Sequence, residues 1–125
     1  MKVKNIIIGI KSLEEMLNKA KDVMKRLEKG ERVAKRKAGI YFDSIETMRK
    51  TITEERVRIL KVIKGKHPSS IYELAGILNR NIKNVSDDVH YLADIGLVDL
   101  KKTKQGREKT TPSVDYDKIQ LEIAV

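Results

Sequence analysis

Polar side chains that could contact a nucleic acid are concentrated between residues 83 and 90. They are Lys83, Asn84, Ser86, Asp87 and His90. Lysine donates hydrogen bonds to guanine, asparagine pairs with two edge atoms of adenine, and aspartate accepts from the cytosine amino group. This set predicts contacts with base edges in the DNA major groove. Asn84 and Asp87 also have a simpler interpretation, because such residues stabilise the first turns of a helix without any ligand.

A second set of residues is suited to contacts with the phosphate backbone. The start of an expected helix near residue 70 offers free amide groups, and a basic stretch around Gly106 offers cationic side chains. The expected backbone contacts are Ser69, Ser70, Tyr72, Arg80, Lys101, Lys102, Lys104, Arg107 and Lys109. The basic stretch could also be a solvated hairpin whose charges deter aggregation of sheet edges.

Two short helices are predicted to hold these residues. Ser70 and Glu73 match a capping box, and the helix that follows has an apolar stripe of Ile71, Leu74, Ala75 and Leu78. Asn79 is expected to end this helix in a left-handed conformation. Asn81 then caps a second helix, with a buried stripe of Val85, Val89 and Leu92. The pattern predicts a helix-turn-helix, although similar helix pairs occur in cores that bind no DNA.

Elements on both sides of this pair complete the expected domain. Asp43 is predicted to cap one short upstream helix and Thr53 another, and Gly65 and Pro68 are predicted to bound the turn that follows. Asp88 is expected to bond to a neighbouring helix. Downstream, the basic stretch KKTKQGREKT and the alternating strand KIQLEIAV predict a strand, a turn and a further strand that together form a wing.

Three motifs occur in order along the chain: YFDSIETMRKTITEERVRIL from Tyr41, SIYELAxILNRNxKNVxxDV from Ser70, and LxDIGLV from Leu92. In these motifs the chain resembles a family of predicted prokaryotic, often archaeal, winged helix-turn-helix transcriptional regulators of the broad MarR/ArsR kind. The resemblance implies DNA binding. It also implies a difference in the DNA sequence read or the mode of contact, because Ser86 and Asp87 stand where the family often has an arginine.

Composition limits the class of protein. The chain has 125 residues, a net charge of +9 and no cysteine, which favours an anionic partner and excludes disulfides and cysteine chemistry. Residues 69–96 nevertheless carry four acidic and two basic side chains, so phosphate contacts must come mainly from the flanks. We find no motif for an enzyme, cofactor or metal site, and no segment long enough to span a membrane. A cytoplasmic protein is expected.

The first 40 residues are predicted to form a strand, a helix and a linker. Ser12 and Glu15 match a second capping box, and Gly30 is expected to end the helix. A narrow apolar stripe on an appended helix needs a cover, which its own domain or a second subunit could provide. We expect homodimerisation through Leu13, Met16, Leu17, Ala20, Met24 and Leu27, with the strand also pairing across the two-fold axis.

The sequence therefore predicts an α+β, mainly helical fold. Residues 1–40 form a strand-helix extension with a linker, and residues 41–125 form a winged helix-turn-helix domain. The expected function is sequence-specific regulation of transcription by a homodimer on double-stranded DNA. The alternative is a protein-protein interaction module, such as an antitoxin or a transcription-complex adaptor.

Overall fold

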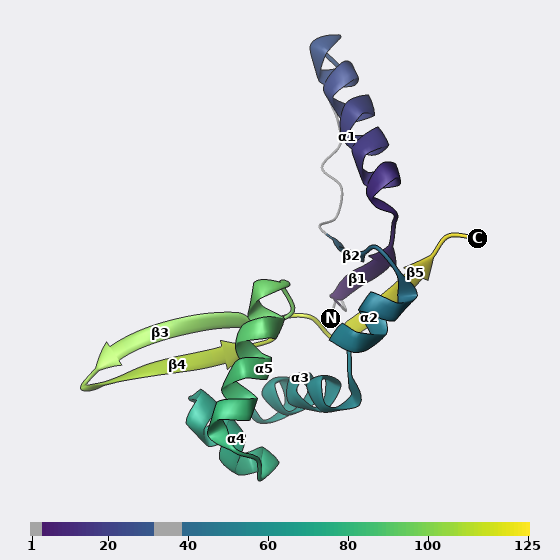
Figure 1. Ribbon diagram of the computed structural model, residues 1–125. Coiled ribbons are helices and arrows are strands. Elements are labelled where there is room, and N and C mark those ends of the chain that lie inside the picture. The colour runs from purple at the N-terminus through teal and green to yellow at the C-terminus, as the bar shows by residue number, and fades with distance from the viewer. Residues whose placement is uncertain (1–3, 32–38) are drawn as a thin grey trace. The chain divides into compact units, whose positions relative to one another are not determined.

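The computed structural model describes residues 4–31 and 39–125, with the backbone alone at residues 105 and 107. The predicted linker lies largely outside these residues. Within them the chain has an α+β fold of five helices and five strands, about half helix and a quarter strand (Figure 1). It divides into two compact units. We call Lys4 with Ile52–Asp117 the hairpin unit, and Asn5–Thr51 with Lys118–Val125 the sheet unit. In the described ranges, no helix has the length and apolar character to cross a membrane.

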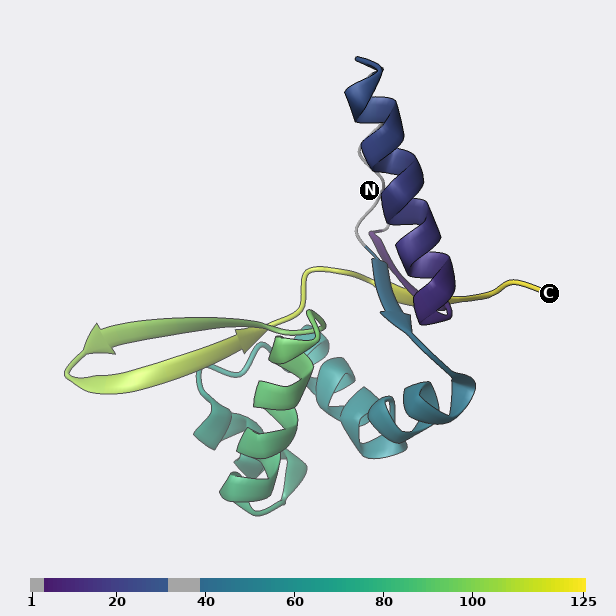
Figure 2. The ribbon, with the colours of Figure 1, turned by 45° about the horizontal axis from the view of Figure 1, so that its top comes forward.

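The hairpin unit contains three helices followed by a two-stranded antiparallel hairpin. These elements are α3 (Glu54–Lys66), α4 (Ile71–Leu78), α5 (Ile82–Asp94), β3 (Asp99–Gln105) and β4 (Arg107–Ser113). Figure 2 shows the base of the long hairpin next to the C-terminal end of α5. The predicted stripes of α4 and α5 are confirmed, because all seven of their residues are buried. They pack with Ile59, Leu60 and Ile63 of α3 and with Leu97 to form one core.

Side-chain caps and left-handed residues set the helix boundaries in this unit. Thr53, Ser70 and Asn81 accept hydrogen bonds from the first turns of α3, α4 and α5, as predicted. Asn79 has the expected left-handed conformation, with φ of 53°. The prediction for Gly65 is wrong, because α3 continues through it to Lys66 and ends at the left-handed His67. A glycine inside a helix costs only about 1 kcal/mol, which packing of α3 offsets.

The C-terminal end of the hairpin unit is fixed by two residues beyond β4. The buried Tyr116 hydroxyl donates to the Leu97 carbonyl at 2.8 Å, and burial raises the pKa of this phenol. Asp117 donates its backbone N–H to the Lys4 carbonyl at 2.7 Å. Its carboxylate accepts from the Lys4 N–H at 3.0 Å and lies 3.3 Å from the Lys64 ammonium. These bonds join Lys4 to the end of the unit.

The sheet unit is built on three parallel strands in the order β2-β1-β5. Its elements are β1 (Asn5–Ile10), α1 (Leu13–Glu28), β2 (Gly39–Phe42), α2 (Ile45–Thr51) and β5 (Lys118–Ile123). Two predictions are wrong here. The C-terminal strand KIQLEI pairs with β1 and is no part of the hairpin, and β1 is paired on both edges, so it has no free edge for a second subunit. Ser44 replaces Asp43 as the cap of α2, since its Oγ accepts from the Thr47 N–H at 3.1 Å.

The two faces of the parallel sheet differ in character. On one face the Tyr41 ring lies over Gly9 and Gly39, where an added Cβ would come within 3.0 Å of the ring. The other face is apolar and includes the buried Ile8. Its edge strand β5 leaves Leu121 and Ile123 nearly half exposed, at 49% and 46%. The predicted half-buried strand is therefore an exposed edge strand with an apolar face.

Candidate nucleic-acid interface

Helix α5 presents a polar face because its apolar stripe is completely buried. Val85, Val89 and Leu92 have no exposed surface, which fixes the orientation of the helix in the hairpin unit. The side chains predicted to contact bases point away from this stripe. Lys83, Asn84, Asp87 and His90 are exposed, and Ser86 is half-buried. Asn81 accepts from the Lys83 N–H at 2.8 Å, so these residues lie in the first three turns of a capped helix.

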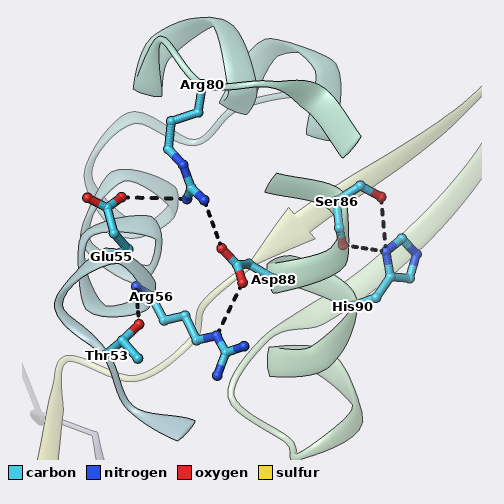
Figure 3. Close-up of polar contacts among 7 residues, drawn as sticks. All are labelled: Thr53, Glu55, Arg56, Arg80, Ser86, Asp88 and His90. Carbon is cyan, nitrogen blue, oxygen red and sulfur yellow. Dashed lines mark hydrogen bonds and ion pairs between the residues drawn. The ribbon is translucent and has the colours of Figure 1, made fainter. Parts of the chain in front are cut away.

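His90 and Ser86 form a local pair on this face (Figure 3). The His90 Nδ1 atom lies 2.8 Å from the Ser86 carbonyl oxygen and 3.2 Å from Ser86 Oγ. A carbonyl oxygen can only accept, so Nδ1 must carry the hydrogen in this bond. The remaining ring nitrogen, Nε2, is then an acceptor in the neutral imidazole and is the ring nitrogen left for an external ligand.

Asp88 joins three parts of the hairpin unit, as expected for a structural residue. Its two carboxylate oxygens bind Arg56 Nε at 3.3 Å and Arg80 Nη2 at 3.2 Å (Figure 3). The Arg56 guanidinium also lies over the Tyr91 ring, 4.3 Å from its centroid. Because Arg56 belongs to α3 and Arg80 to the turn between α4 and α5, one carboxylate holds both elements against α5.

Arg80 does not occupy the position expected of a phosphate contact. Its side chain is 25% exposed, with Nη2 on Asp88 and Nη1 3.6 Å from Glu55 Oε2. Nη1 is buried, and Glu55 lies beyond hydrogen-bond distance of it. Asp87 is exposed, whereas the next residue, Asp88, is half-buried and provides an acceptor inside the unit. The Arg80 guanidinium is directed inward because it binds this acceptor. The sequence around the turn did not predict that Arg80 would bind Asp88, eight positions away.

Several polar groups at the start of α4 already have hydrogen-bond partners within the protein. Ser70 Oγ accepts from the Glu73 N–H at 3.0 Å, while the Glu73 carboxylate accepts from Ser69 Oγ at 2.6 Å. The bonds from Ser69 hold the pKa of the Glu73 carboxyl below its ordinary value. This negative charge at the helix N-terminus opposes a phosphate there. Tyr72, another residue of this group, is 77% exposed.

The hairpin is strongly basic, and like α3 it carries five basic and two acidic side chains. The side chains of Lys101, Lys102, Lys104 and Lys109 are all exposed, and Gly106 takes the turn with φ of 83°. The side chain of Arg107 lies outside what the structure describes. Thr111 of β4 donates to the Ser69 carbonyl at 2.7 Å, which fixes the hairpin base beside the start of α4. The cationic strands are thereby anchored next to the two helices.

An open groove of about 390 Å³ joins these surfaces. It brings together five predicted residues, Ser70, Tyr72, Ser86, His90 and Lys109. It also contains four that were not predicted, Ile71, Ile82, Glu108 and Thr110. Ile82 was missed because its spacing from Val85 and Val89 suits the buried stripe, yet it is 45% exposed. The groove therefore combines exposed apolar surface with hydrogen-bonding groups and with side chains of both charges.

The model of the family HVO_A0114 matches residues 51–121, more than half of the 125 residues. The chain belongs to the HVO_A0114 family. Among curated proteins, no sequence matches it. The HVO_A0114 match contains α3, α4, α5 and the whole hairpin, and so includes every residue that lines the groove.

Proposed function

We propose that the hairpin unit is a winged helix-turn-helix domain that binds double-stranded DNA sequence-specifically and regulates transcription. In this proposal α4 and α5 are the helix-turn-helix, α5 enters the major groove, and β3 with β4 is the wing. The observation that carries the proposal is the anchored hairpin. The bond from Thr111 to Ser69 holds the hairpin base beside the start of α4, and Ser86 and His90 of α5 line one groove with Lys109 of β4. Backbone and base contacts would then be available on one side of the unit.

Charge distribution assigns different roles to the two parts. The segment 69–96 is net negative, whereas the hairpin carries lysines on both strands. Affinity for phosphates then comes from Lys101, Lys102, Lys104 and Lys109, and discrimination between bases from α5. Lys83 and Asn84 are suited to guanine and adenine, and His90 presents Nε2 as an acceptor for an exocyclic amino group. Arg80 is assigned to the internal Asp88 network instead of to DNA.

The test is fluorescence anisotropy with the full chain, comparing duplexes from its own promoter region with random duplex over a salt series. Lys83→Ala/Asn84→Ala should lose the preference for one duplex, by about 10–100-fold if one or two base contacts disappear. Lys102→Ala/Lys104→Ala should weaken binding to every duplex and reduce the salt slope by about 2, for two lost phosphate contacts. Arg49→Ala/Lys50→Ala, which removes two exposed cations of α2 in the sheet unit, is the matched control.

A protein partner is the second candidate function. The specific observation in its favour is the exposure of Tyr72 and Ile82, at 77% and 45%, in a groove that Glu108 also lines. An interaction module of the antitoxin or adaptor type would use this surface. Equal, weak binding to all duplexes, with both α5 and hairpin variants behaving as wild type, would contradict DNA recognition and favour the protein partner.

A further inference from the structure

Helix α1 of the sheet unit exposes a continuous apolar stripe. Ser12 Oγ caps it through the Glu15 N–H at 3.1 Å, and Gly30 follows its end with φ of 79°. None of its sixteen residues is buried. The apolar side chains recur at the spacing of a helix that packs along another helix, and they are Leu13, Met16, Leu17, Ala20, Val23, Met24 and Leu27. Four of them, Leu13, Leu17, Met24 and Leu27, are 53–66% exposed.

The order of residues in α1 is symmetric about Ala20. Counting outward from Ala20, each apolar residue on one side has an apolar residue at the same distance on the other. The pairs are Leu17 with Val23, Met16 with Met24, and Leu13 with Leu27. An antiparallel pair of identical helices places such equidistant residues opposite each other across a two-fold axis. The stripe is therefore complementary to a second copy of itself, with the smallest side chain at the centre, where the helices approach most closely.

The charges of α1 follow the same symmetry with opposite sign. The first turn contains Glu14 and Glu15, and the last turn contains Lys25 and Arg26. In an antiparallel pair the acidic turn of one helix lies beside the basic turn of the other, whereas a parallel pair would bring like charges together. Lys19 and Lys21 flank Ala20 and would repel their counterparts, so the apolar residues must provide the association.

We propose that α1 pairs antiparallel with α1 of a second copy of this chain, with the two-fold axis at Ala20. The alternative cover is the apolar edge strand β5 of the sheet unit, where Leu121 and Ile123 are exposed. That surface would match the apolar stripe but would not complement the acidic first turn and the basic last turn of α1, where Arg26 also lies 3.4 Å from Asp22 of the same helix. The self-pairing does not rest on DNA binding, and its tests need no DNA.

Cysteine cross-linking of the full chain tests the arrangement directly, because the protein has no cysteine of its own. Ala20→Cys should give a disulfide-linked dimer under mild oxidation. Leu13→Cys should remain monomeric alone but cross-link when mixed with Leu27→Cys. Asp22→Cys, on the opposite face of α1, is the matched control and should not cross-link. Circular dichroism verifies that each variant retains its helices.

Charge reversal gives an independent measurement by sedimentation equilibrium. Glu14→Lys/Glu15→Lys and Lys25→Glu/Arg26→Glu should each weaken self-association by roughly tenfold, as expected for several exposed like-charge pairs. An equimolar mixture of the two should form a heterodimer at least as well as wild type, because each acidic turn then faces a basic one. A monomeric wild type, cross-linking of Leu13→Cys by itself, or failure of the mixture to associate would each overturn the proposal.

Discussion

Removal of the Asp88 carboxylate should destabilise the hairpin unit. Asp88→Ala eliminates the acceptor for Arg56 at 3.3 Å and for Arg80 at 3.2 Å. Breaking a buried ion pair costs about 3–5 kcal/mol, and a single bond to a charged group contributes about 1.5–3 kcal/mol. The Asp88 side chain is 19% exposed and the two arginines 21% and 25%, so water partly compensates the freed guanidinium groups. We therefore expect a loss of about 2–3 kcal/mol in the free energy of unfolding.

The assay is urea unfolding followed by circular dichroism, with hydrogen exchange to locate the effect in α3, α4 and α5. Asp87→Ala is a matched control, because it removes the same charge from the adjacent, exposed position. It should change the free energy of unfolding by no more than about 0.5 kcal/mol. Equal stability of the Asp88→Ala and Asp87→Ala proteins would refute the assignment of Asp88 as the residue that joins α3 and the α4–α5 turn to α5.

Two further predictions concern backbone conformation and pH. Asn79 has φ of 53°, so Asn79→Gly should keep wild-type stability within about 1 kcal/mol, whereas Asn79→Val should lower it by about 1–3 kcal/mol in the same urea assay. If valine were tolerated as well as glycine, the left-handed turn would not be required. The Lys4 N–H and the Lys64 ammonium hold the pKa of the Asp117 carboxyl below its ordinary value of 3.8. The folded state therefore binds this proton less tightly than the unfolded state, and the resulting stabilisation is lost as the pH falls below 3.8. Asp117→Asn should make the free energy of unfolding less sensitive to acid. The same loss of stability at low pH in the variant and the wild type would contradict this reasoning.

Local signals in the sequence predicted the helices well. The caps at Ser12, Thr53, Ser70 and Asn81 were all confirmed, because an N-cap depends on a side chain and an amide two or three residues away. The buried stripes of α4 and α5 were confirmed for the same reason. Their spacing matches the helical period, and burial of one face follows from that period.

Strand partners could not be predicted in this way. The alternation in KIQLEIAV correctly indicated a strand, but its nearest strands in sequence form the hairpin, and hairpin pairing is the usual outcome for neighbours. Its actual partner is β1, more than 100 residues earlier, in a parallel register from Asn5 with Lys118 to Ile10 with Ile123. Nothing in the alternation of a strand specifies a partner at that distance, because both pairings place the same residues on one face.

The candidate site shows the same division between local and distant information. The polar face of α5 followed from its buried stripe, so the exposure of Lys83, Asn84, Asp87 and His90 could be predicted. The inward direction of Arg80 could not, because it depends on where Asp88 and Glu55 meet the turn after folding. A cationic side chain in a turn beside a polar helix can either extend into solvent or bind an internal carboxylate. Choosing between them requires the packing of α3 against α5. The hairpin residues Lys101, Lys102, Lys104 and Lys109 are all exposed, which makes them the better candidates for DNA phosphates.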